Sequence, residues 1–159
     1  MRHAWRHESP YGTLTVVVSD AGVAEITLPG ADAPDIALGA ADAGVARELD
    51  DWFAGRRHAF GVRADLDAVG GFRRLVLETL AREVGWGETV TYGELAELAG
   101  RPGAARAVGG AMRANPVPFV IPCHRVVAAG GRIGGYGGGR DAVGLKRSLL
   151  AREGVSTLR

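Results

Sequence analysis

The chain has 159 residues, and 47% of them are apolar, which is enough for one ordinary domain with a packed core. Its single cysteine excludes an internal disulfide and a zinc site built from several thiolates. The formal charge is only +1, but residues 101–159 carry ten basic and two acidic side chains, a net +8, whereas residues 1–100 carry nine and sixteen, a net −7. Such asymmetry is expected of a protein that meets a polyanion, and solvated arginines are the alternative explanation.

Residues 1–7 lack the apolar segment of a secretory signal, and no apolar run in the chain has membrane-spanning length. We therefore expect a cytoplasmic protein without a membrane partner. The three histidines outside the cysteine motif, His3, His7 and His58, show no ligand-like spacing. The sequence thus predicts neither a metal site nor a cofactor.

Residues 1–68 are predicted to form a small N-terminal α/β module. After a turn at 9–12, the β-branched runs Thr13–Ser19 and Val23–Leu28 predict an antiparallel hairpin. The next residues, 29–44, are rich in Ala, Asp, Gly and Pro, which is typical of a connecting loop.

The same module is predicted to add a helix and a strand after this loop. The apolar spacing over Val45–Phe53 predicts a helix that ends at Gly55. The segment His58–Leu66 is expected to form a further strand.

Residues 69–159 are predicted to form a mainly helical module. Its first helix starts at Phe72, where the apolar spacing becomes helical again. Thr91 and Glu94 have the spacing of a capping box at the start of a second helix, Tyr92–Ala99.

A third helix, Ala104–Arg113, is predicted after a short glycine-containing turn. Two helices joined in this way indicate a helix-turn-helix, with an ordinary helical hairpin as the alternative. Arg106 and Arg113 are about two turns apart, so they share one face of the helix. Small residues such as Ala105 and Gly109 would let this helix approach a nucleic-acid groove closely.

The only cysteine lies in the largely apolar stretch Val120–Val127. A neighbouring histidine, His124, lowers the cost of forming a thiolate, so Cys123 is a candidate nucleophile. The alternative is that Cys123 is merely a small, buried apolar side chain. The loop at 130–139 is rich in glycine around Tyr136 but lacks a GxxxxGK[ST] motif, which favours contact with a flat ligand over triphosphate binding.

Six motifs then occur in a characteristic order. They are Tyr92-Gly93-Glu94-Leu95-Ala96, Ala105-Arg106-Ala107-Val108-Gly109-Gly110-Ala111-Met112, Asn115-Pro116, Pro122-Cys123-His124-Arg125-Val126-Val127, Gly135-Tyr136-Gly137-Gly138-Gly139 and the closing segment Lys146–Gly154. Together they resemble the O6-alkylguanine-DNA alkyltransferase family, over nearly the whole chain and most specifically after Gly87. The resemblance implies an α/β fold, in which residues 1–68 hold an antiparallel, ribonuclease H-like sheet and residues 69–159 form a C-terminal DNA-binding domain with a helix-turn-helix.

The resemblance also implies a function, which is direct-reversal DNA repair. The alkyl group of O6-alkylguanine, and also of O4-alkylthymine, would move to the cysteine sulfur in a single turnover after the nucleotide is flipped out of the duplex. The implied partner is double-stranded DNA with alkylated bases, bound by a monomer, and cooperative binding stays open. By similarity Arg106 would fill the vacated space, and Tyr92 would donate a proton toward the purine. The implied DNA contacts are Tyr92, Ala105, Arg106, Gly109 and Arg113, and the implied base pocket is Met112, Arg113, Val126, Val127, Tyr136 and Gly137.

The resemblance assigns the remaining catalytic roles as well. His124 would take the thiol proton through a water, oriented by Glu153 and assisted by Asn115. Glu153 ends a closing helix predicted over Leu145–Glu153. The connection 139–146 is longer than is usual in the family, so the position of Glu153 is the least constrained.

Other protein classes remain open from the residues alone. An alkyltransferase-like binding protein would recognise the lesion without a transfer step, and it would not need the reactive cysteine. A helix-turn-helix regulator would bind palindromic DNA, and a cysteine hydrolase would require an oxyanion hole.

Overall fold

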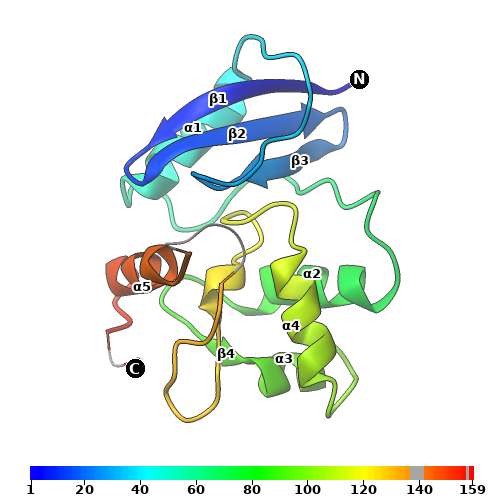
Figure 1. The fold of residues 1–159 in the computed structure, drawn as a ribbon, viewed down its shortest axis with the longest axis vertical. Coiled ribbons are helices and arrows are strands. Elements are labelled where there is room, and N and C mark those ends of the chain that lie inside the picture. The colour runs from blue at the N-terminus through cyan, green and yellow to red at the C-terminus, as the bar shows by residue number, and fades with distance from the viewer. Residues whose placement is uncertain (137–141, 157) are drawn as a thin grey trace.

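The structure is a computed structural model that describes residues 1–136, 142–156 and 158–159. Its N-terminal part contains a three-stranded antiparallel sheet of order β1-β2-β3, which lies at the top of Figure 1. The strands are β1 (His3–Ser9), β2 (Gly12–Ser19) and β3 (Gly22–Thr27). The predicted hairpin is therefore confirmed as β2 and β3. Strand β1 was not predicted, because it contains no β-branched residue and is held by its pairing with β2.

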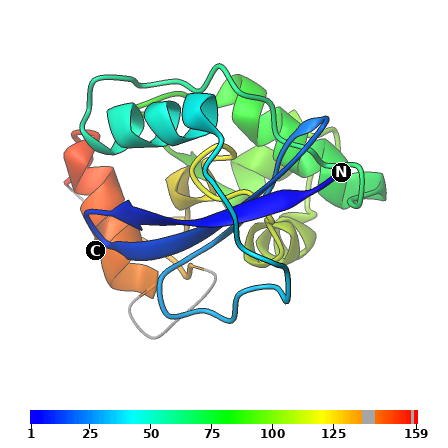
Figure 2. The same ribbon diagram turned by 90° about the horizontal axis from the view of Figure 1, so that it is seen from above.

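Both faces of this sheet are covered. Helix α1 (Ala43–Phe53) packs on one face, and its first turn is capped by Asp42, whose side chain accepts a hydrogen bond from the Val45 amide at 3.0 Å. The connection between β3 and α1 crosses the other face, where Ile36 packs against Ala4, Val17 and Ala24 (Figures 1 and 2). It then reaches the edge of β1, where the Gly39 amide donates to the Ala4 carbonyl at 2.8 Å. The predicted helix is confirmed.

The predicted strand at His58–Leu66 is wrong. This segment forms only an isolated bridge between Val23 and Ala64, with backbone bonds from the Val23 amide to the Arg63 carbonyl and from the Asp65 amide to the Val23 carbonyl. Most of its residues are exposed or half-buried, so there is no buried face to favour a regular strand. It instead closes over the edge of β3 as an irregular segment.

The C-terminal part is mainly helical and lies below the sheet in Figure 1. Its helices are α2 (Gly71–Glu83), α3 (Tyr92–Leu98), α4 (Ala105–Arg113) and α5 (Ala142–Arg152), and two short strands, β4 (Val90–Thr91) and β5 (Val126–Val127), pair in parallel. The capping box of Thr91 and Glu94 is present, so the predicted start of α3 is confirmed. None of the helices within the described ranges is long and apolar enough to cross a membrane.

One hydrophobic core runs through both parts of the chain. At its centre Trp52, the penultimate residue of α1, packs against aromatic rings from later segments, including Phe119 and Trp86. The Arg152 guanidinium at the end of α5 lies 4.3 Å from the centre of the Trp52 ring and donates to the Trp52 and Phe53 carbonyls. The ends of α1 and α5 are thereby tied together, and this fixes the segment that follows Arg152.

Candidate active site

The loop between α4 and the cysteine is held by one side chain, that of Asn115. Its Oδ1 accepts from the Val117 amide at 3.0 Å, and its Nδ2 donates to the Ile121 carbonyl at 2.9 Å. Within this loop Phe119 adopts φ +74°, a left-handed conformation that is costly for an aromatic residue and persists because its ring is buried. Asn115 therefore fixes the chain two residues before Cys123.

Cys123 begins a single 3-10 turn, η1 (Cys123–Arg125), and only 5% of its surface is exposed. Burial raises the pKa of this thiol, because the thiolate loses hydration. The side chains of Asn115 and Tyr136 beside the sulfur and the charge of Lys146 lower the pKa in part. The resting thiol is therefore protonated and needs a base before it can attack.

His124, the next residue, belongs to a buried polar network with Arg125 and Glu153. Its Nε2 lies 2.6 Å from Glu153 Oε2, and Arg125 Nε donates to Glu153 Oε1 at 2.8 Å. Burial by itself would raise the pKa of Glu153, but the hydrogen bonds from His124 and Arg125 bring the pKa down to about 2. The amide of Gly87 also donates to Glu153, at 3.1 Å.

The protonation of His124 follows from this network. Burial lowers the pKa of His124, so the ring is neutral near pH 7. A carboxylate can only accept, so Nε2 carries the hydrogen and Nδ1 is left with a free lone pair. Nδ1 is buried and has no partner among the described protein atoms. It is therefore a buried acceptor that is free to take a proton.

A second buried cation, Lys146 of α5, joins the two sides of the site. Its amine donates to the Val126 carbonyl at 2.6 Å and to the Gly135 carbonyl at 2.8 Å. Burial lowers the pKa of Lys146 to about 8, which the nearby Cys123 opposes. Lys146 therefore fixes β5 against the loop that carries Tyr136. Lys146 was not predicted as a site residue, because nothing in its local sequence marks it as buried.

The cysteine sulfur opens into a cavity of about 470 Å³. This cavity is bordered by α3, α4, η1 and the glycine-rich loop, and its lining residues are Tyr92, Ala105, Arg106, Gly109, Met112, Arg113, Cys123, Gly135 and Tyr136. Burial raises the pKa of Tyr92, so its hydroxyl keeps its proton. The fold thus brings nine residues from four separate segments around one space.

Glycine is required in one wall of this space. Gly134 has φ +76°, and a Cβ there would lie 3.3 Å from the Tyr92 hydroxyl and 3.2 Å from the Ala128 amide nitrogen. A side chain at this position would push Tyr92 away from the cavity.

Two of the implied pocket residues, Val126 and Val127, are buried in the core and do not line the cavity. Gly137 lies outside the residues that the structure describes.

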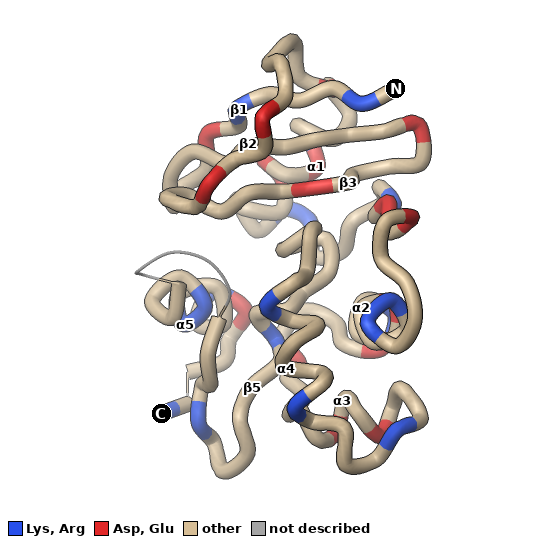
Figure 3. Tube along the Cα trace, turned by 45° about the vertical axis from the view of Figure 1, so that its right-hand side comes forward, with Lys and Arg blue, Asp and Glu red and all other residues tan. Residues whose placement is uncertain are grey.

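The charge of the surface around the cavity is uneven. Helix α4 carries only basic charged residues, Arg106 and Arg113, and both are exposed. Within the described residues neither arginine forms an ion pair. Figure 3 shows acidic positions on the strands of the N-terminal sheet and basic ones along α4. The open side of the cavity is thus bordered by unpaired positive charge, as expected for contact with phosphates.

A family model for the DNA-binding domain of 6-O-methylguanine DNA methyltransferase matches residues 71–155. The chain belongs to this family. The match includes α2, α3, α4, the Cys123 turn and all of α5, so every lining residue of the 470 Å³ cavity falls within it. No group of three or more potential ligands arranged for a metal ion occurs among the described residues.

Relatives agree with this assignment. The chain is 62% identical over 86 residues to the methylated-DNA–protein-cysteine methyltransferase of Mus musculus, which is 54% of this chain and 40% of the mouse protein. It is 47% identical over 111 residues to the protein of the same name from Mycolicibacterium paratuberculosis, covering 70% of this chain and 64% of the relative. The aligned region thus spans between two fifths and two thirds of these curated proteins.

A solved structure of the Mycobacterium tuberculosis protein OGT in complex with DNA is similar over almost its whole length. The TM-score is 0.84 at 35% identity, and the match covers 98% of this chain and 94% of that one. The fold of this member of the 6-O-methylguanine DNA methyltransferase family therefore includes the N-terminal sheet as well as the matched domain.

Proposed function

We propose that the protein performs direct-reversal DNA repair by moving the alkyl group of O6-alkylguanine in duplex DNA to its own Cys123. The observation that carries the proposal is the position of Cys123, whose sulfur opens into the 470 Å³ cavity next to the unpaired basic face of α4. Membership of the family and the likeness to a DNA-bound relative support the same conclusion.

The chemistry follows from the buried network. A water held by His124 Nδ1 relays the thiol proton to that nitrogen, and Glu153 stabilises the imidazolium that forms. The sulfur attacks the alkyl carbon as the carbon–O6 bond breaks, and the purine keeps the electron pair and takes a proton from Tyr92. The thioether has no carbonyl that water could attack. Each molecule therefore reacts once.

DNA binding is assigned to α3 and α4 as a helix-turn-helix, with α4 in the groove. Arg106 fills the space that the flipped nucleotide leaves, while Ala105, Gly109 and Arg113 lie against the backbone. The target base enters the cavity beside Met112 and Tyr136. The pocket role of Gly137 and the positioning role of Asn115 belong to the same proposal, whereas Val126 and Val127 are not part of the pocket.

Several finer points are part of the proposal. The N-terminal sheet with α1 is of the ribonuclease H-like type, and the units are residues 1–68 and 69–159, since α2 begins just after this boundary. The protein acts as a monomer and also accepts O4-alkylthymine. The opposite charges of its two halves are compatible with cooperative binding on DNA. A lesion-binding protein without transfer is the second candidate, and the presence of Cys123 disfavours it.

Incubation with a duplex that contains O6-methylguanine tests the transfer. We expect the mass of the protein to rise by one methyl group on Cys123, once and in stoichiometric yield. Cys123→Ala should still bind the duplex and show no shift, and Arg106→Ala should slow transfer relative to Arg47→Ala, a change on the exposed side of α1. Tight binding by the wild type with an unchanged mass would support the lesion-binding alternative, and repeated turnover would exclude the single-use mechanism.

A further inference from the structure

Arg152 is the last residue of α5 and comes directly before Glu153. Its Nη1 donates to the carbonyls of Trp52 and Phe53, at 2.9 and 2.7 Å. These residues end α1, where the helix dipole favours a cation, and the last turn of α1 contains no basic residue of its own. Both helix ends lie at the left of Figures 1 and 2. The positive charge at the end of α1 therefore comes from the far end of the chain.

Two indole rings enclose the same guanidinium. Its central carbon lies 4.3 Å from the centre of the Trp52 ring and 4.9 Å from the centre of the Trp86 ring. The Nε and Nη2 atoms of Arg152 are buried and have no hydrogen-bond partner among the described atoms. Arg152 is thus held by ring faces and two carbonyls rather than by a carboxylate. The carboxylate of Glu153 is left to its other partners.

The segments that hold Arg152 also contact the base and its carboxylate. The Trp52 ring packs with its edge toward the ring of His124, with 5.8 Å between the ring centres. Gly87, which follows Trp86, donates its amide to Glu153 at 3.1 Å. The guanidinium and the carboxylate next to it are therefore fixed by the same two segments, the end of α1 and the turn after α2.

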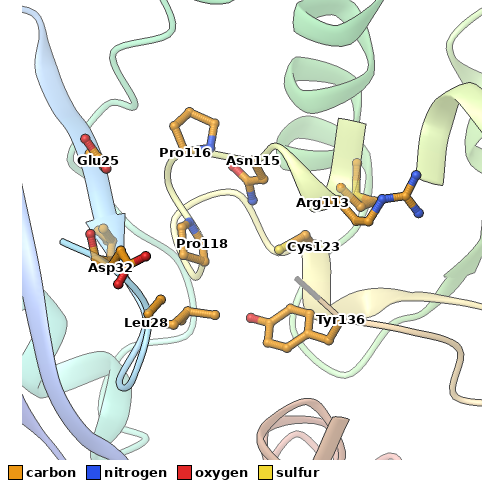
Figure 4. Close-up of a pocket in the computed structure, with 13 residues that line it drawn as sticks. Glu25, Leu28, Asp32, Arg113, Asn115, Pro116, Pro118, Cys123 and Tyr136 are labelled. Atoms are coloured by element: carbon orange, nitrogen blue, oxygen red, sulfur yellow. The ribbon is translucent and has the colours of Figure 1, made fainter. Parts of the chain in front are cut away.

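The anchoring contacts lie away from the reacting sulfur. Cys123 borders the cavity of about 470 Å³ and a second one of about 190 Å³, and neither Arg152 nor the two indole rings are among the described residues that line them. Figure 4 shows the smaller cavity, with Cys123 between Asn115 and Tyr136. An effect of Arg152 on the thiol must therefore pass through its neighbour Glu153.

We propose that Arg152 is a positioning residue for alkyl transfer, which anchors the end of α5 to the end of α1 and so holds the Glu153 carboxylate against His124. The inference rests on the transfer function proposed above. The 2.6 Å contact between Glu153 and His124 keeps the hydrogen on Nε2 and leaves Nδ1 as the acceptor. A misplacement of about 1 Å can cost about 100-fold in rate. The N-terminal part of the chain thereby takes part in activating Cys123.

The variant Arg152→Met tests the anchor, because methionine keeps apolar packing and removes the charge and every donor. We expect the single-turnover rate of transfer from O6-methylguanine to fall about tenfold, with an unchanged affinity for the duplex. Arg152→Lys should recover part of the rate, since its amine keeps the charge and can donate to the same carbonyls. Arg147→Met, at an exposed position of α5, is the matched control and should keep the wild-type rate. A wild-type rate in Arg152→Met, or a loss confined to DNA affinity, would overturn the proposal.

The imidazole of His124 reports the position of Glu153 directly. With ¹⁵N-labelled histidine, the NMR spectrum of the wild type should show a neutral ring with a slowly exchanging hydrogen on Nε2. Arg152→Met should show a mixture of tautomers and faster exchange of this hydrogen. Val18→Ala removes buried volume from β2, outside these contacts, so it should lower the stability and leave the His124 signals unchanged.

The spectrum also separates positioning from a purely structural role. A slow Arg152→Met variant with wild-type His124 signals would overturn the proposal, because the loss would then not pass through Glu153. No transfer from O6-methylguanine by the wild type would instead contradict the proposed function. The His124 signals of Arg152→Met would still decide whether the guanidinium positions Glu153, so the two failures are distinguishable.

Discussion

His124 and Glu153, 29 residues apart in the chain, are joined by a 2.6 Å contact between Nε2 and Oε2, and neither side chain is exposed to solvent. Arg125 shares the same carboxylate, so one acidic group holds the tautomer of the base and neutralises a buried cation. In the proposed mechanism, the reactivity of Cys123 therefore depends on the same side chain as the stability of the fold.

Replacing Glu153 by Gln should reduce both the transfer rate and the stability of the fold. The Arg125 guanidinium would be left buried without a counter-charge, and we expect the free energy of unfolding to fall by about 3 kcal/mol, measured in urea. The rate of transfer to Cys123 should fall as well, because the imidazolium loses its stabilising carboxylate. Glu97→Gln, at an exposed position on α3, is the control and should change neither. A stable Glu153→Gln variant with the wild-type rate would contradict the assigned role.

The carboxylate of Glu153 also predicts how the free energy of unfolding changes as the pH falls. The pKa of Glu153 in the folded chain, about 2, lies below its ordinary value of 4.5, so the unfolded chain takes up the proton first as the pH falls. The contribution of this carboxylate to the free energy of unfolding is complete above pH 4.5. It is lost as the pH falls from 4.5 to about 2. The pKa of His124 is also lowered by folding, so the free energy of unfolding begins to fall as the pH drops below 6.5. Urea midpoints at pH 7, 5 and 3 should show both losses, and Glu153→Gln should lack the lower one.

The lowered pKa of Lys146 predicts that the transfer rate is limited at alkaline pH. Its pKa of about 8 means that it loses its charge above that pH, and with it the attraction for the developing thiolate. The single-turnover rate should therefore fall above pH 8, once the rise due to easier loss of the thiol proton is subtracted. Lys146→Met should be slow at all pH values and lack this decline, whereas Arg147→Met, an exposed neighbour, should keep it. A decline that persists in Lys146→Met would show that another group titrates.

A substitution at Gly109 should change the stability of the fold and the affinity for DNA in opposite directions. A Cβ at this position of α4 would have only the Arg113 side chain near it, at 3.9 Å, so the helix tolerates a side chain there. Gly109→Gln should raise the free energy of unfolding by about 0.5 kcal/mol, because glutamine is the better helix former. Affinity for duplex DNA should nevertheless fall, because the bulk blocks close approach to the groove. Gly110→Gln, outside the cavity lining, should gain the stability and keep more of the affinity. Equal affinities in the two variants would argue against α4 as the groove-binding helix.

Much of the local structure could be predicted from the sequence. The capping box of Thr91 and Glu94 fixed the start of α3, and the apolar spacing of Val45–Phe53 gave α1. These features depend on hydrogen bonds and side-chain contacts within a few residues, which the order of the residues specifies directly. The adjacency of Cys123 and His124 is likewise a property of the chain itself.

Other features were decided only by the tertiary structure. The sequence pattern missed β1, which forms through pairing with β2, and it assigned a strand at His58–Leu66 where only a bridge occurs. Burial of Lys146 and the hydrogen bond from the Ile26 amide to the Pro116 carbonyl likewise depend on segments far apart in the chain.

The physical reason is that the cost of burying a charge and the shape of a cavity depend on which segments meet. The sequence by itself therefore made Cys123 the candidate nucleophile and Ala104–Arg113 the candidate DNA-binding helix. Only the packing of both parts around Trp52 decided how the thiol is shielded and which carboxylate contacts His124.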